Sequence, residues 1–178
     1  MDKEKIFIVC DNKDISLAVC KNIVLNNDEV SIIPTFSTDT EYYHELSENY
    51  IYYLDTVNVN LSYKNNALLY IITSNYISHG ITIDDFYNND IAFMNIEEYN
   101  NIPDVLFKKY NILTIWIDTK RHKSINKKDN IELKYFNERI NEYKYMYFLS
   151  DDINIHNIIN NYILANETEK ENIIKDNS

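Results

Sequence analysis

The stretch KIFIVCDNKDISLAVCKNIVL, residues 5–25, decides the fold of this chain. It opens with an apolar run at residues 6–10, which is short enough for one strand buried on both faces. Polar residues 11–14 follow as a turn, and the apolar positions from Ile15 to Val24 then recur at a spacing closer to that of a helix than of a strand. The stretch therefore predicts a buried strand, a tight loop and a helix.

The loop at residues 11–14 occupies the place where mononucleotide-binding proteins hold a phosphate on backbone N–H groups at a helix N-terminus. It contains no glycine, so its backbone does not readily take the φ > 0 conformations of a phosphate nest, and no Gly-Lys-Ser/Thr sequence closes it. Asp11 and Asp14 would place negative charge where an anionic phosphate should lie. The sequence thus predicts the skeleton of a nucleotide site without its chemistry.

The length of 178 residues predicts one domain, residues 1–165, followed by a frayed polar tail at residues 166–178. A formal net charge of -11 argues against a nucleic-acid or anionic-membrane surface and permits a basic protein partner or mimicry of a nucleic acid. Cys10 and Cys20 are expected to be reduced core thiols, and the sequence has neither a signal peptide nor an apolar run of membrane-spanning length. We expect a cytoplasmic protein with no cofactor. We also expect no metal, because His44, His122 and His156 are dispersed and show no metal-ligand spacing.

Further apolar runs predict the other core elements. Strands are predicted at residues 29–33, 90–95, 112–118 and 145–149, and helices at residues 131–143 and 153–164. Strands separated by helices favour a three-layer α/β fold, a parallel sheet with helices on both faces. Residues 51–63, whose apolar positions alternate, the apolar run at 67–73 and residues 74–80 predict a small β sheet. With a loop at 35–39 and a short helix at 40–49, it makes up a subdomain inserted at about residues 35–88.

The order of these elements and several strings resemble the guanylate kinase family, whose members have a P-loop NTPase fold. The resemblance runs over most of residues 5–164. It is carried by residues 5–25, by DEVSIIPTFST at 28–38, NYISHGIT at 75–82 and DIAFMNIE at 90–97, and by EYKYMYFLSDDINIHNIINNYIL at 142–164. The family's phosphate-loop glycines fall on Asp14 and Ser16, and its catalytic lysine falls on Leu17.

Other functional positions of the family also carry different residues here. The first arginine that grips the nucleotide monophosphate falls near Ser37, and the acid that reads guanine falls near Leu68. The tyrosine before the family glycine falls on His79, while the Asp-x-Asp pair becomes Asn95 and Glu97. The resemblance leaves plausible chemistry at Gly80, Thr82 and Glu97, and gives the lid arginines loose counterparts in Arg121 and Lys123. It therefore implies a degenerate member of the family.

The candidate residues of the former nucleotide cleft are Asp11, Lys13, Asp14, His79, Gly80, Thr82, Asn95, Glu97 and Arg121. Each also has a structural interpretation. Lys13 fits a surface lysine, Asp14 a helix N-cap, and Asn95 with Glu97 a turn after a strand. His79 fits a partly exposed histidine, and Gly80, as the one glycine in the chain, a special backbone conformation.

Three functions follow from this pattern. The first is a catalytically inactive guanylate kinase-like protein that binds another protein, because the family's lysine, glycines and nucleotide-gripping arginine are all replaced. Sixteen tyrosines fit an interaction surface. Abundant Asn, Ile, Lys and Tyr, which have A/T-rich codons, suggest a viral inhibitor of a host factor. The alternatives are a protein that binds or sequesters a nucleotide and a divergent active nucleoside monophosphate kinase.

Overall fold

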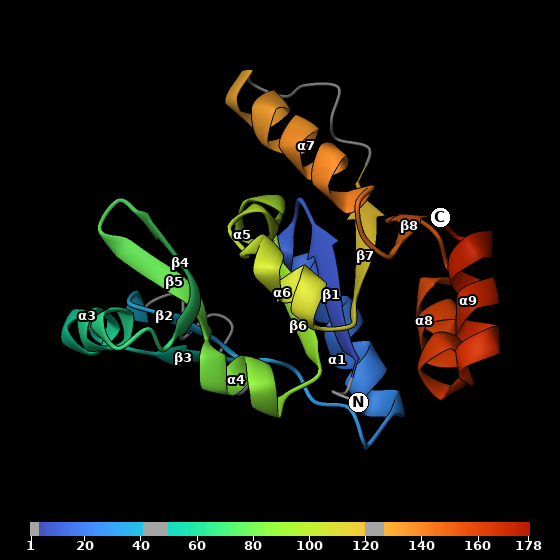
Figure 1. Cartoon of the computed structure of the whole chain (residues 1–178), viewed down its shortest axis with the longest axis horizontal. Coiled ribbons are helices and arrows are strands. Elements are labelled where there is room, and N and C mark those ends of the chain that lie inside the picture. The colour runs from blue at the N-terminus through green and yellow to red at the C-terminus, as the bar shows by residue number, and fades with distance from the viewer. Residues whose placement is uncertain (1–3, 41–49, 120–126) are drawn as a thin grey trace.

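The computed structural model describes residues 4–40, 50–119 and 127–178. Its central sheet has four parallel strands in the order β6–β1–β7–β8 (Figure 1). These strands are β1 (Lys5–Cys10), β6 (Ile91–Met94), β7 (Ile112–Asp118) and β8 (Tyr145–Leu149). Every residue of β1 and β6 is buried, as the continuous apolar runs predict for parallel strands covered on both faces.

Two helical layers cover the central sheet, and the alternation of β1 side chains shows which layer meets which face. Ile6, Ile8 and Cys10 pack with helices α1 (Lys13–Asn26) and α8 (Ile155–Leu164). Phe7 and Val9 pack on the opposite face with α5 (Ile96–Asn100), α6 (Asp104–Lys109) and α7 (Lys127–Ile140). The predicted three-layer α/β fold is confirmed. Both cysteines are free and buried, as expected.

A second sheet lies beside the central one, in the order β3–β2–β5–β4. It contains β2 (Thr35–Ser37), β3 (Ile51–Tyr53), β4 (Leu68–Ser74) and β5 (Ile77–Thr82). Strand β5 pairs antiparallel with both β2 and β4, whereas β2 and β3 run parallel. This sheet and helices α3 (Thr56–Lys64) and α4 (Ile83–Asn88) fall within residues 35–88, where the inserted subdomain is predicted.

Several predicted elements of this region are wrong in detail. Residues 35–37 form β2 rather than a loop, and the strand predicted at residues 51–63 ends at Tyr53 and gives way to α3. Helix α3 begins there because the Asp55 carboxylate accepts a hydrogen bond from the Asn58 N–H at 2.9 Å. Residues 29–33 contribute one isolated bridge, Ile32 to Ile91, instead of a strand. Most of the helix predicted at residues 40–49 lies outside the described residues.

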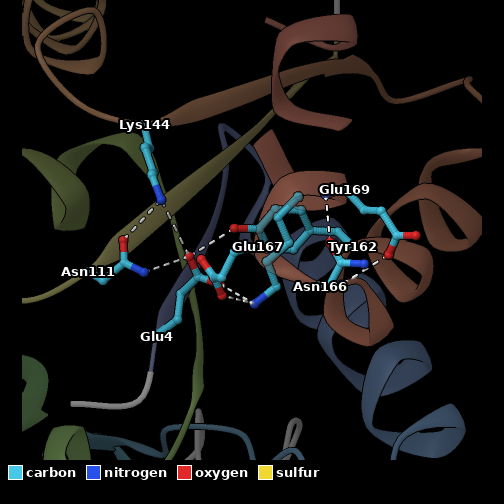
Figure 2. Close-up of polar contacts among 8 residues, drawn as sticks. Glu4, Asn111, Lys144, Tyr162, Asn166, Glu167 and Glu169 are labelled. Carbon is cyan, nitrogen blue, oxygen red and sulfur yellow. Dashed lines mark hydrogen bonds and ion pairs between the residues drawn. The ribbon is translucent and has the colours of Figure 1, made fainter. Parts of the chain in front are cut away.

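The predicted frayed tail is also wrong, because residues 167–176 form helix α9 (Glu167–Asp176). Asn166 and Glu169 form a reciprocal capping box at its start. The Lys170 ammonium lies 3.1 Å from the Glu4 carboxylate, which also accepts a hydrogen bond from the Tyr162 hydroxyl at 2.8 Å (Figure 2). The Lys170 contact holds α9, and the Tyr162 contact holds α8, at the start of β1, a long-range arrangement that a polar sequence does not reveal.

Candidate binding cleft

A cleft of about 370 Å³ opens between the carboxyl ends of β1 and β6 and the second sheet. Parallel α/β sheets commonly bind ligands at this edge. The start of α1 and the start of α5 supply one wall, and the β4–β5 hairpin with the end of β2 supplies the other. The described lining residues are Lys13, Ser37, Asp39, Ser74, Asn75, Ile77, His79, Asn95 and Glu98.

A buried ion pair forms the floor of this cleft. The Lys13 ammonium lies 2.5 Å from Oε1 of Glu98, whose side chain is fully buried, while the side chain of Lys13 is 13% exposed. The ammonium also lies 5.2 Å from the centre of the Phe93 ring. The second oxygen of Glu98 accepts a hydrogen bond from the Asn95 N–H at 2.9 Å. The carboxylate is therefore held from two sides, which is how a buried charge is normally compensated.

His79, in strand β5 of the second sheet, also contacts the Glu98 carboxylate. Its Nε2 lies 3.5 Å from Oε1 of Glu98, and its side chain is 26% exposed. Burial lowers the pKa of His79 below its ordinary value of 6.5; the Glu98 carboxylate opposes this shift, and the Lys13 ammonium adds to it. His79 is therefore neutral at pH 7, and Lys13 is the one fixed cation among the described residues that line the cleft.

No residue of the loop after β1, residues 11–14, has a positive φ. Asn12, and not Asp14 as predicted, is the N-cap of α1, because its side chain accepts the Asp14 N–H at 3.0 Å. Asp14 is exposed in the first turn of the helix, where its negative charge interacts favourably with the helix dipole. The Asp11 carboxylate accepts a hydrogen bond from the Thr119 hydroxyl at 2.5 Å and so ties this loop to the end of β7. Neither acid lines the cleft.

Asn95 and Glu98 form a capping box at the start of α5, with the Asn95 side chain accepting the Glu98 N–H at 2.8 Å. Glu97, the acid chosen from the sequence, is exposed and does not line the cleft, whereas the overlooked Glu98 does. The spacing Asn-x-x-Glu was a usable signal, because a capping-box glutamate is held back over the helix start. It would have pointed to Glu98 rather than Glu97.

Gly80 and Thr82 support the second sheet instead of lining the cleft. Gly80 does not have a positive φ, so the expected special backbone conformation is wrong. Glycine is needed there for space, because a Cβ would lie 2.2 Å from the Tyr70 carbonyl oxygen and 3.1 Å from the Phe36 ring. Thr82 is the N-cap of α4. Arg121 lies outside the described residues.

The candidates that the structure brings together in the cleft are therefore Lys13, His79 and Asn95, joined by Glu98, Ser37 and Asp39. Ser37 falls near the position where the resemblance places a nucleotide-gripping arginine, and it is buried at the end of β2.

Within the described part of the chain, no cluster of three or more His, Cys, Asp or Glu side chains could hold a metal ion. The helices described there are all too short or too polar to cross a bilayer.

The comparison with solved structures supports the fold. The chain is similar to the crystal structure of guanylate kinase from Anaplasma phagocytophilum, with a TM-score of 0.61 at 9% sequence identity. The match covers 91% of this chain and 85% of that one. No family model and no curated protein sequence matches the chain. The fold is thus guanylate kinase-like and of the P-loop NTPase type, while the identity is too low to carry over an activity.

Proposed function

We propose that this chain is a catalytically inactive guanylate kinase-like protein that binds another protein through the cleft between its two sheets. The observation that carries the proposal is the Lys13–Glu98 ion pair, in which the one fixed cation among the described lining residues is bound to a fully buried carboxylate. Phosphoryl transfer depends on cations that neutralise the transferring phosphates. An internally paired lysine does not supply that charge.

The energetics of the ion pair also disfavour binding of a nucleotide phosphate. To contact a phosphate, Lys13 would leave Glu98, and Glu98 would remain as an uncompensated charge inside the protein. Breaking a buried pair in this way costs about 3–5 kcal/mol. Asp39 adds a second carboxylate to the lining, so the phosphate would also meet unfavourable charge. The cleft keeps the place of a nucleotide site without the electrostatics that such a site needs.

A small-molecule-binding role is the second candidate, because the cleft volume of about 370 Å³ falls within the range of ligand pockets. Polar side chains in its lining, such as Asn75, Ser74 and Asn95, would bind a nucleotide through hydrogen bonds that do not use Lys13. This candidate predicts a rise in the melting temperature with a small ligand alone, whereas the leading proposal predicts that cleft binding needs a macromolecular partner.

The activity test incubates the chain with ATP and either GMP or dTMP and measures formation of the diphosphate. We expect no phosphoryl transfer, and we expect none of the three nucleotides to raise the melting temperature. A nucleotide that binds only the folded state, present at a concentration of 100 times its Kd, would raise the free energy of unfolding by about 2.7 kcal/mol. The thermal assay is therefore sensitive to weak binding. Product formation would refute the inactive assignment, and nucleotide stabilisation alone would favour the second candidate.

The partner test compares proteins captured from host extract by the wild type and by two variants. Ile77→Asp places a charge in the cleft lining, and Ile131→Asp places the same charge on the exposed face of α7 as a control. We expect a partner that Ile77→Asp loses and Ile131→Asp retains. The inhibitory viral role rests on residue usage alone, and this experiment also tests it through the identity of the captured protein. Equal capture by both variants would place the interaction elsewhere.

A further inference from the structure

The two walls of the cleft belong to two parts of the fold, and the chain connects these parts at the opposite end of β6. The second sheet, α3 and α4 lie together beside the central sheet (Figure 1), and the chain crosses between the two parts at residues 31–34 and 89–90. The Ser31 N–H and hydroxyl each donate to the Asp90 carboxylate at 3.0 Å, so the crossings are tied to each other. They lie at the start of β6, whereas the cleft lies at its end. This arrangement is that of a hinge.

At the cleft end, His79 connects the two walls. Its Nε2 in β5 lies 3.5 Å from Oε1 of Glu98 in α5. Glu98 does not depend on this contact, because the Lys13 ammonium and the Asn95 N–H already compensate its charge. The side chain of His79 is 26% exposed, so water already reaches part of it. The contact can therefore break without leaving the buried carboxylate unpaired.

The charges around His79 decide which protonation state suits the contact. The described charged groups that face His79 or share its cleft are Glu97 and Glu98 of α5, Lys13 of α1, and Asp39 after β2. The residues paired with it in β2 and β4 are Ser37 and Ile72, which carry no charge. Burial is the largest influence and lowers the pKa of His79 below 6.5; Lys13 adds to this shift, and the two glutamates oppose it. The contact therefore suits a neutral imidazole.

We propose that His79 is a pH switch, which holds the second sheet against α5 at neutral pH and lets the cleft open when the imidazole is protonated in acid. In the closed cleft, a protonated imidazole is incompletely hydrated and lies near the Lys13 ammonium. Turning of the second sheet about the crossings moves the imidazolium into water. The proton is then bound more favourably in the open form, so acid shifts the population toward that form.

The size of the shift follows from proton linkage. In the open form, an imidazole with the ordinary pKa of 6.5 is about ten times more often protonated than neutral at pH 5.5. The ratio of open to closed molecules therefore rises by up to about tenfold between neutral pH and pH 5.5. The consequence for a protein partner rests on the proposed function: a partner that contacts both walls of the cleft is released when the walls separate.

Fluorescence energy transfer between two dyes tests the opening. Tyr63→Cys in α3 and Lys108→Cys in α6 place the dyes on exposed positions of the two parts, while the native cysteines are buried. We expect the transfer efficiency to fall reversibly between pH 7.5 and pH 5.5. The matched variants are His79→Gln and His156→Gln, the second of which removes a histidine of α8. The pH response should vanish in His79→Gln and persist in His156→Gln.

Two further measurements keep the test decisive if His79→Gln disturbs the cleft. An NMR titration of the wild-type His79 imidazole should have the same midpoint as the change in energy transfer. The partner that Ile77→Asp loses should be captured from host extract at pH 7.5 and lost at pH 5.5, by the wild type and by His156→Gln alike.

The outcomes separate the pH switch from the proposed function. Transfer that does not change with pH, or an equal change in the two histidine variants, would overturn the switch even if a cleft partner is captured. Transfer that falls in acid only while His79 is present, with no partner captured at either pH, would support the switch and count against the proposed function.

Discussion

At the residue scale, the cleft is defined by one carboxylate and the groups that hold it. Glu98 receives the Lys13 ammonium at 2.5 Å and the Asn95 N–H at 2.9 Å, and His79 lies at 3.5 Å. Lys13 comes from the start of α1, Glu98 from α5 and His79 from the second sheet. The Lys13 ammonium therefore joins the start of α1 to the start of α5 through a buried carboxylate.

The Glu98→Gln substitution tests this stabilising role. Glutamine keeps the side-chain shape but removes the charge, so the Lys13 ammonium is left largely buried without its counter-ion. We expect the free energy of unfolding in urea to fall by about 3 kcal/mol. The matched control is Glu97→Gln at the exposed neighbouring position, which should change it by no more than about 0.5 kcal/mol. Equal effects of the two variants would contradict the role given to Glu98.

The pH dependence of stability tests the environment of His79. Its pKa in the folded chain is lowered from 6.5, so near and below pH 6.5 the unfolded chain binds the proton more readily than the folded one. Stability contributed by neutral His79 is therefore present above pH 6.5 and lost as the pH falls below it. Urea unfolding on both sides of pH 6.5 should show a larger loss in the wild type than in His79→Gln. An equal loss in both would mean that burial does not hold the imidazole neutral.

At the element scale, the C-terminal helix shows how long-range contacts order a polar segment. Helix α9 has no fully buried residue, yet Ile173 and Ile174 pack partly against the core on the α1–α8 face. Lys170 pairs with Glu4, and the Asn177 carbonyl accepts the N–H of Tyr147 in β8. The helix therefore covers both a helical face and a sheet edge.

Removal of residues 166–178 tests whether α9 belongs to the folded unit. We expect the free energy of unfolding in urea to fall by at least about 2 kcal/mol, because two partly buried isoleucines and the Glu4 ion pair are lost. Ile174→Ser should reproduce part of this loss, whereas Lys175→Ser at the exposed next position should leave stability nearly unchanged. Full stability of the shortened chain would restore the prediction of a frayed tail.

At the scale of the whole molecule, the central sheet could be predicted and the second sheet could be predicted in part. Strands β1 and β6 are apolar runs buried on both faces and β7 is nearly so, whereas the edge strand β8 is apolar but has Tyr147 exposed on one face. Residues 51–63 are ambiguous, since their apolar residues fit alternation as well as a short helix, and the Asp55 cap decides for α3. The single domain with an insertion stays a prediction.

The location of the candidate cleft could be predicted from the sequence, but the full set of residues that line it could not. Lys13 and Asn95 follow from the order of strands and loops, because the carboxyl ends of the parallel strands β1 and β6 meet at one edge, whereas His79 lies within antiparallel β5 and was chosen from the family resemblance. Glu98 is separated from Glu97 by the capping-box spacing Asn-x-x-Glu, and the rotation of α5 buries the Glu98 carboxylate and exposes that of Glu97. Ser37 and Asp39 enter the lining through the pairing of β2 with β5, a contact between residues far apart in the chain.

The sequence by itself determined the order of the core elements and the absence of a glycine-rich loop after β1, because periodicity and composition are local properties of the chain. The tertiary structure alone decided the Lys13–Glu98 pair, the contact of His79 with it, and the docking of α9 on Glu4. Each of these joins segments far apart in sequence. The partner of a buried charge depends on which side chains the packed elements bring within a few ångströms, and no local pattern records that proximity.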